Sequence, residues 1–241
     1  VAGLAPQLFG DDGPRRYLVV VATPSELRGS GGLIGSFGEI EADGGRLRLT
    51  RLERIQRLID ASDPTTQASV FDPRVLQAYD PFDLARFWQN RAAPPDFALA
   101  AEGMEAGYEA ATGSTVDGTI LVTPGALARI LAVTGPIQVP TWPVPLSSEN
   151  AAQVLLVDQY VALDGDLREE FLATVAGAVF ERLISMTLPA VVDLVDQLEP
   201  AVAGGHLRVH LARQAEQDLS SVLGLDGSPL SPIAFCRHEQ I

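Results

Sequence analysis

Two charged residues, Glu26 and Arg28, follow an apolar run at residues 17–21 and the dipeptide Thr23-Pro24, where a buried strand is expected to end. Side chains converge on ligands at such strand ends, so charge placed there suits binding better than packing. In extended backbone, residues two apart point to the same side, so the carboxylate and the guanidinium would share one cavity. The alternative is a turn between two strands that carries a surface ion pair.

Ser30, Gly31 and Gly32 follow this charged pair and lead into a second apolar run at residues 33–37. Glycine lets the backbone approach a ligand closely, and backbone N–H groups in such a bend can bind an anion. We therefore expect this segment to contribute to an anion site. No helix is expected directly after it, which argues against a nucleotide-binding loop.

Other residues offer chemistry with weaker support. His206, Arg208 and His210 alternate on an expected strand and so share one face. They could bind a metal, but no third ligand has useful spacing, and the alternative is a row of solvent-facing polar residues at a sheet edge. Asp96 and Asp117 are further candidates for acid chemistry, and the alternatives are a helix cap at Asp96 and a turn at Asp117.

The composition excludes several classes of function. The 241 residues carry a formal net charge of −14, which argues against a nucleic-acid partner. All 17 basic residues are arginine, so a Schiff-base or catalytic lysine is excluded. Cys236 is the only cysteine, which excludes an internal disulfide and a thiolate metal site. The chain starts without Met and shows no apolar run of about 18 residues, so we expect a soluble fragment of a longer protein.

The elements that would position these residues can be read from hydrophobic patterns. Three early strands are expected, with a hairpin turn at Asp43-Gly44-Gly45, over residues 17–22, 33–42 and 46–52. Three Asp-Pro pairs predict the starts of short helices, at residues 63, 72 and 80. A helix over residues 98–112 precedes a strand, helix and short strand that fit a β-α-β crossover, over residues 116–122, 125–133 and 137–139.

The rest of the chain is expected to be mainly helical. The predicted helices cover residues 167–186, 189–198 and 214–223, with one strand at 206–211. The first of these contains an apolar stretch from Phe171 to Ile184, which is either ordinary core or the wall of an apolar groove. We predict a single α/β (α+β) domain over residues 17–227, with a central mixed β-sheet flanked by helices on both faces. Residues 1–16 would be a lead-in and residues 228–241 a polar tail.

Two motifs resemble a known family. Residues 26–36 contain E-L-R-x-x-G-G-x-I-G-S, and residues 116–140 contain V-D-G-T-I-L-V-T-P-x-A-L-x-x-I-L-x-x-T-G-P-I-x-V-P. Together with Glu149-Asn150 these motifs resemble domain-of-unknown-function family 4012. That family's members look like membrane-anchored bacterial envelope proteins without an established activity. The resemblance implies an extracytoplasmic domain held near the membrane by a segment outside this chain.

The order of the early strands and charges is also similar to the LytR-CpsA-Psr phosphotransferases, which move a glycopolymer from a polyprenyl pyrophosphate carrier onto peptidoglycan. This more distant resemblance implies a LytR-CpsA-Psr-like fold, with Glu26 as a ligand of Mg²⁺ and Arg28 as a grip on the pyrophosphate. Further anion-binding arginines would be Arg51 or Arg54, and Arg168. Gly31-Gly32-Leu33 stands where those enzymes carry an aspartate, and losing a carboxylate weakens a magnesium site.

Two hypotheses for function follow. In the first, the domain transfers or binds a polyprenyl-phosphate-linked glycan or lipid, with Glu26 and Arg28 as catalytic residues. Substrate contacts would come from the first inter-strand bend and from other charged residues, namely Arg28, Ser30, Gly31, Gly32, Arg51, Arg54, Asp117 and Arg168. In the second, the domain keeps the fold without catalysis and binds a glycan, a lipid or a protein partner.

Overall fold

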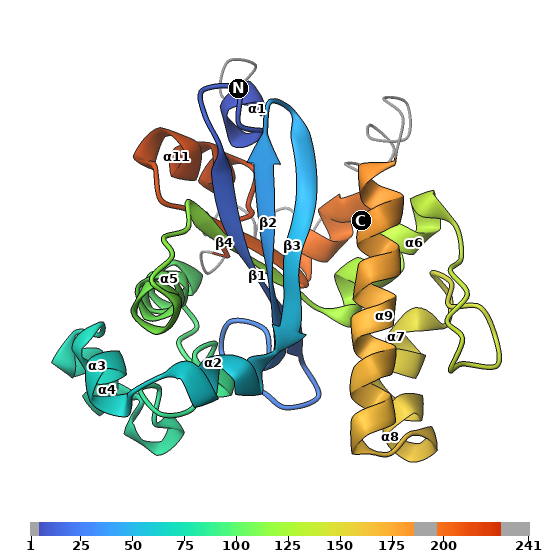
Figure 1. Cartoon of the computed structure of the whole chain (residues 1–241), viewed down its shortest axis with the longest axis horizontal. Coiled ribbons are helices and arrows are strands. Elements are labelled where there is room, and N and C mark those ends of the chain that lie inside the picture. The colour runs from blue at the N-terminus through green and yellow to red at the C-terminus, as the bar shows by residue number, and fades with distance from the viewer. Residues whose placement is uncertain (1–4, 186–196, 228–241) are drawn as a thin grey trace, which may run out of the picture.

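A five-stranded mixed sheet forms the centre of the molecule, with strand order β3-β2-β1-β4-β5. The computed structural model describes residues 5–185 and 197–227. The strands are β1 (Arg15–Thr23), β2 (Leu33–Asp43), β3 (Arg46–Arg54), β4 (Gly118–Val122) and β5 (Leu207–Leu211). Figure 1 shows α5 and α2–α4 on one side of this sheet and α6–α9 on the other. The predicted mixed sheet with helices on both faces is confirmed.

The early strands form the antiparallel meander that their sequence pattern predicts. β1 pairs with β2, and β2 pairs with β3 through a turn in which Gly44 and Gly45 have φ of 53° and 79°. Positive φ at both positions suits a tight hairpin and explains the glycines. β4 then returns to lie parallel to β1, and β5 pairs antiparallel with β4. The carboxyl ends of β1 and β4 therefore meet at one edge of the sheet.

Short helices and one long helix cover the face of the sheet on which α5 lies. These are α2 (Ile55–Ala61), α3 (Pro64–Ser69), α4 (Pro73–Ala78), η1 (Asp80–Phe82), η2 (Trp88–Asn90) and α5 (Phe97–Thr112). Asp63, Asp72 and Asp96 cap their helices through their side chains, as predicted, whereas Asp80 begins only a 3₁₀ turn. Each such cap stabilises its helix by about 1 kcal/mol.

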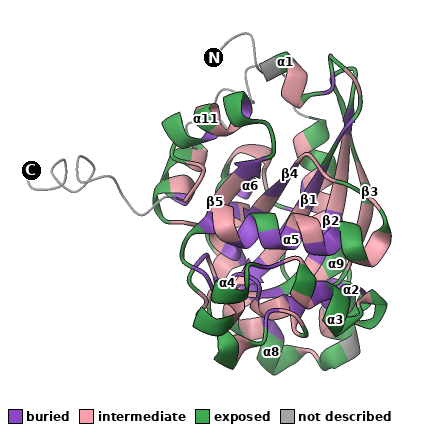
Figure 2. Cartoon of the chain, turned by 90° about the vertical axis from the view of Figure 1, so that its left-hand side faces the viewer, coloured by how far each residue is buried: buried purple, intermediate pink, exposed green. Residues whose placement is uncertain are grey.

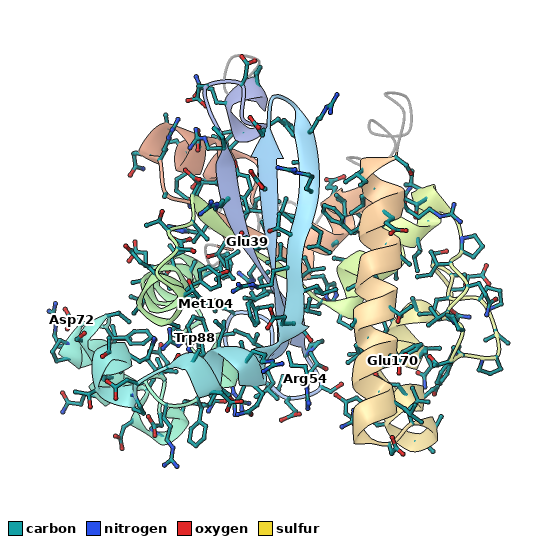
Figure 3. The ribbon with its side chains drawn as sticks, viewed as in Figure 1. Glu39, Arg54, Asp72, Trp88, Met104 and Glu170 are labelled. Carbon is teal, nitrogen blue, oxygen red and sulfur yellow. The ribbon has the colours of Figure 1, made fainter. Side chains whose placement is uncertain are left out.

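The main core lies between this helical layer and the sheet. Its buried side chains include Leu18 and Val20 from β1, Trp88 from η2 and Met104 from α5. Figure 3 shows Trp88 and Met104 between the helices and the strands, and Figure 2 shows buried residues gathered along α5 and the strands behind it. Full burial of a side chain of this size contributes about 1.5–3 kcal/mol. This core holds the carboxyl edge of the sheet in place.

A second cluster forms on the other side. It involves α6 (Pro124–Thr134), α7 (Ala151–Gln153), the π-helical turn η3 (Val154–Asp158), α8 (Gln159–Ala162) and α9 (Gly165–Ile184). Phe171, Val175 and Val179 of α9 are buried there, and the Phe171 ring lies 5.2 Å from that of Trp142. The inward face of the apolar helix is therefore ordinary core. No helix in residues 5–185 or 197–227 is long and apolar enough to cross a membrane.

The predicted β-α-β crossover is wrong in its last strand. Ile137 makes only an isolated antiparallel bridge with Leu146, which closes a loop beside α6. Gly135-Pro136 and Pro140 bracket the apolar run, so it is too short to add a strand to the sheet. The small elements α1 (Ala5–Leu8) and α11 (Gln214–Val222) complete the fold. Most of the predicted helix at residues 189–198, the polar tail and Cys236 lie outside the described residues.

Candidate functional site

A small pocket lies where the carboxyl ends of β1 and β4 meet the start of β5. Its volume is about 160 Å³. It lies under the bend that joins β1 to β2 and beside the turn that enters β5. The lining residues come from this bend, the helix start after β4 and the turn before β5, namely Pro24, Leu27, Arg28, Gly29, Gly31, Gly32, Thr123, Gly204, Gly205, His206 and Arg208.

Ser30 and Gly31 do not offer their backbone N–H groups to an anion. The N–H of Ser30 donates to the carbonyl of Ala92 at 2.9 Å, and that of Gly31 donates to the carbonyl of Arg28 at 3.2 Å. The Ser30 hydroxyl is buried and donates to the carbonyl of Pro94. The expected role of Ser30 and Gly31 as backbone or hydroxyl contacts to an anion is therefore wrong, because carbonyl groups of this same protein already accept from these donors.

Close packing of backbone against backbone explains the glycines instead. A Cβ on Gly29 would lie 2.6 Å from the carbonyl oxygen of Ala93, and one on Gly32 would lie 2.0 Å from that of Thr23. Both distances are far below contact, and the clashing atoms are main-chain atoms that cannot rotate away. The glycines line the pocket because they let three chain segments meet there.

Arg28 points its guanidinium at a neutral partner. Its Nε and Nη2 donate to Oδ1 of Asn90 at 3.0 and 2.8 Å, and its Nη1 donates to the carbonyl of Leu27 at 2.8 Å. The ring of Phe82 lies 5.2 Å from the guanidinium carbon. An arginine has five N–H donors, so two remain for a ligand. Arg28 is thus half-buried, oriented and not neutralised by a carboxylate within the described residues.

Arg208 reaches the same pocket from β5. Its Nη1 donates to the carbonyl of Gly227 at 2.8 Å, and its Nε is buried without a partner in the described part of the chain. Burial lowers the pKa of Arg208, and the charge of Asp226 acts in the opposite direction. An anion in the pocket would offset part of the cost of burying this charge.

His206 and Thr123 form the third side of the pocket. Nδ1 of His206 lies 2.9 Å from Oγ1 of Thr123, which also accepts a hydrogen bond from the N–H of Gly125. A Cβ on Gly125 would lie 2.6 Å from the His206 ring, so glycine is needed for this contact. Thr123 therefore caps α6 and also holds the imidazole in place.

Glu26 does not join Arg28 in the pocket. Glu26 is exposed and absent from the pocket lining, so the expected shared cavity for this pair is wrong. Among the described residues, no three His, Cys, Asp or Glu side chains gather where they could hold a metal ion. The lining of the pocket contains no carboxylate, so its donors do not suit a protein-held magnesium ion.

The other predicted arginines also lie away from the pocket. Arg51 donates from Nη1 to the hydroxyl of Tyr108 at 3.3 Å, and Arg168 stacks over the ring of Tyr160 at 4.9 Å. Arg54 lies at the end of β3, just before α2 (Figure 3). None of the three lines the pocket. Of the predicted anion-binding arginines only Arg28 lines the pocket, and Arg208 is the second arginine there.

Asp117 belongs to a charge cluster at the opposite edge of the sheet. Its carboxylate accepts from Nη1 of Arg15 at 3.0 Å and from the backbone N–H of Arg16 at 2.9 Å. Arg15 also contacts Glu216 at 2.9 Å, and both of these side chains are only 1% exposed. The expected substrate contact of Asp117 is therefore wrong, because its carboxylate is engaged by Arg15 and Arg16 at the end of the sheet away from the pocket.

His210 is not the solvent-facing edge residue that alternation predicts. It is 7% exposed, and its Nδ1 lies 2.8 Å from Oε1 of Glu105, which also accepts from the hydroxyl of Thr119. Burial lowers the pKa of His210, but the hydrogen bond and charge of Glu105 outweigh it, so the pKa is raised. α5 covers β5 here, which a strand pattern alone does not reveal.

Sequence reasoning missed part of the pocket. The alternation of His206 and Arg208 placed them on one face, but gave no reason to join them to Arg28. Asn90 and Phe82 carried no signal, because an amide and an aromatic ring in an irregular segment have many ordinary uses. Asn90 acts through a contact with Arg28 across 62 residues of chain, and Phe82 acts through a similarly long-range contact with the same side chain.

Comparison with known proteins gives a family match. The family model described as "Protein of unknown function (DUF4012)" matches residues 12–160. This range covers the bend, Arg28, Asn90 and Thr123, but ends before β5. No curated protein matches the chain.

Several solved structures are similar to this chain over most of its length. The transcriptional regulator yvhJ from Bacillus subtilis is 10% identical, with a TM-score of 0.37 over 91% of this chain and 78% of that one. Protein gbs0355 from Streptococcus agalactiae is 10% identical, with a TM-score of 0.44 over 93% and 76%. B. subtilis TagV is 12% identical, with a TM-score of 0.39 over 89% and 79%. At these values the similarity does not inform the site.

Proposed function

This chain belongs to the DUF4012 family of proteins of unknown function, and we propose that it is an extracytoplasmic envelope domain that binds the phosphate group of a polyprenyl-phosphate-linked glycan or lipid. The proposed binding site is the arginine pocket, defined by Arg28, Arg208 and His206. The resemblance to the LytR-CpsA-Psr phosphotransferases supports the choice of ligand.

The observation that carries the proposal is the charge of this pocket. The chain has 31 acidic and 17 basic residues, yet the pocket lining contains two arginines, a histidine and no carboxylate. Like charges brought together in this way repel one another unless an anion lies between them. Guanidinium groups donate paired hydrogen bonds to phosphate oxygens, which makes phosphate the best match.

The size of the pocket limits what enters it. Sites for drug-sized ligands measure about 300–1,000 Å³, whereas this pocket measures about 160 Å³. A phosphate or pyrophosphate group therefore fits inside, and the rest of the ligand stays outside. Leu27 lines the pocket and is 83% exposed, so it offers an apolar contact for a hydrocarbon chain at the rim.

Binding is favoured over transfer. Phosphoryl transfer needs charge neutralisation and a group that positions or activates the acceptor. The only acidic residue of the bend, Glu26, lies outside the pocket. Any Mg²⁺ would arrive with the phosphate oxygens and keep several of its waters, as this ion commonly does.

The test is titration calorimetry with inorganic pyrophosphate and with farnesyl pyrophosphate, a short soluble prenyl ligand. We expect Arg28→Gln and Arg208→Gln each to weaken both ligands by about 10–100-fold, the usual range for a lost charged hydrogen bond. Arg168→Gln is the matched control, because Arg168 contacts Tyr160 and not the pocket. Absence of pyrophosphate binding by the wild type would overturn the proposal.

The lipid part of the proposal has its own variant. Leu27→Ser should weaken farnesyl pyrophosphate and leave inorganic pyrophosphate unchanged, because the side chain is proposed to touch only the hydrocarbon. Equal affinity of the wild type for the two ligands would contradict a lipid-linked substrate. Release of inorganic phosphate from farnesyl pyrophosphate with Mg²⁺ present would instead favour transfer. Protease added to intact cells should digest the domain if it lies outside the cytoplasm.

A further inference from the structure

We infer that Asn90 is the positioning residue of the arginine pocket, because it aims the Arg28 guanidinium and leaves its positive charge available to the ligand. This inference rests on the proposed function of the pocket. It assigns a role to a residue that does not line the pocket and is 62 positions away in the chain.

The contact between Asn90 and Arg28 holds the guanidinium at two points. A single acceptor, Oδ1 of Asn90, receives both Nε and Nη2, at 3.0 and 2.8 Å. Phe82 lies 5.2 Å from the guanidinium carbon, so its ring restricts the position of the group from another direction. The remaining donors of Arg28 keep a defined direction, which lowers the entropy lost when a ligand binds.

Asn90 is itself held by the surrounding loop. Its Nδ2 donates to the carbonyl of Phe82 at 2.6 Å, and its own carbonyl accepts from the N–H of Ala93 at 2.8 Å. The N–H of the next residue, Arg91, donates to the carbonyl of Trp88 at 3.1 Å, which continues the η2 turn. The amide therefore acts from a fixed support, as a positioning residue must.

The amide is the feature that decides the charge. An arginine that donates to a carboxylate loses most of its electrostatic attraction for an anionic ligand, because the two opposite charges cancel at hydrogen-bond distance. Asn90 offers the same acceptor geometry without the negative charge. Asparagine at this position is thus compatible with an anion site, and aspartate is not.

Two variants separate the orientation of the Arg28 guanidinium from its positive charge. Asn90→Ala removes both hydrogen bonds but keeps the positive charge of Arg28. Asn90→Asp keeps an acceptor for Arg28 and cancels its charge. It also loses the hydrogen bond from Nδ2 to the carbonyl of Phe82, and the control variant Asn150→Asp loses an equivalent bond. We expect both to weaken inorganic pyrophosphate about tenfold or more, since each removes one requirement of a charge-assisted contact. Affinity is measured by calorimetry over a series of NaCl concentrations.

The salt series distinguishes a positioning role from a purely structural one. Added salt screens a charged site, so the loss of affinity with NaCl should be shallower in Asn90→Asp than in the wild type. Asn90→Ala keeps the charge and should keep the wild-type salt dependence. A general loss of structure would lower affinity in both variants without this difference.

Asn150 supplies a matched control. Its Oδ1 accepts from the N–H of Ser147 at 2.8 Å and its Nδ2 donates to the carbonyl of Pro145 at 3.0 Å, so it too is an amide held between loop groups. Asn150→Asp adds the same charge away from the pocket and should bind pyrophosphate like the wild type. If the wild type binds pyrophosphate and Arg28→Gln loses it, while both Asn90 variants bind normally, the inference fails and the proposed function stands. If the wild type does not bind pyrophosphate, both fail.

Discussion

Gly32→Ala tests whether the glycines of the first bend serve chain packing. Gly32 has φ of +122°, a conformation that residues with a Cβ rarely adopt. An added Cβ would lie 2.0 Å from the carbonyl oxygen of Thr23 and 2.7 Å from the nitrogen of Pro24. Both atoms belong to the backbone at the end of β1, so neither can move aside as a flexible side chain would.

The expected cost is the sum of two effects. A strained backbone conformation costs about 1–3 kcal/mol, and overpacking against fixed atoms costs about another 1–3 kcal/mol. We therefore expect Gly32→Ala to lower the free energy of unfolding by at least about 2 kcal/mol. For a domain of this size that corresponds to a fall in Tm of at least about 4–8 °C.

The assay is urea denaturation followed by circular dichroism, with two other glycines as controls. Gly44 has φ of +53° with nothing within 4 Å of an added Cβ, so Gly44→Ala reports the strain alone. Gly35 has no positive φ and open space around it, so Gly35→Ala should change stability by less than about 0.5 kcal/mol. The reasoning is refuted if Gly32→Ala costs no more than Gly44→Ala.

Three further predictions concern residues outside the pocket. His210→Gln should lower the free energy of unfolding most at low pH. Glu105 raises the pKa of His210 in the folded state. The stabilisation from this pair is therefore complete below the unfolded pKa of about 6.5 and is lost as pH rises through the folded value. The unfolding free-energy difference from the wild type, measured from pH 5 to 8, should shrink with pH, and a constant difference would contradict the pair. Arg91→Met should lower the free energy of unfolding by at least about 3 kcal/mol in urea denaturation, because it leaves several buried acceptors without a donor. A loss under about 1 kcal/mol would show that these acceptors find other partners. Asp117→Asn should cost about 1–2 kcal/mol through its contact with Arg15 and leave pyrophosphate affinity unchanged, whereas a fall in affinity would return Asp117 to the site.

The local pattern of the chain was sufficient for most elements of the fold. Alternating residues predicted β3 because one face of that strand meets the rest of the molecule and the other meets water. Asp63, Asp72 and Asp96 predicted helix starts because a carboxylate next to the first turn accepts a free N–H group. The wrong strand at residues 137–139 shows the limit of this approach, since an apolar run does not reveal whether a partner strand is within reach.

The site was only partly predictable. The position of Arg28 after a buried strand pointed to the end of the sheet where the candidate pocket lies, because β1 is central and its end is open to ligands. Its neighbour Glu26 has an equally suggestive spacing but is exposed in the bend. Side chains two residues apart point to the same side only where the backbone is extended, and the chain turns between β1 and β2.

What the amino-acid sequence by itself determined is most of the strands and caps, the family resemblance and the exclusion of lysine chemistry and of a disulfide within the chain. These follow from residue type and from contacts between near neighbours in the chain. Only the tertiary structure decided that Arg28 lines one pocket with Arg208 and His206 while Glu26 stays outside it, and that Asn90 holds Arg28. These residues come from segments separated by 62 residues or more. Such segments are brought together by sheet order and loop packing, which no local pattern encodes.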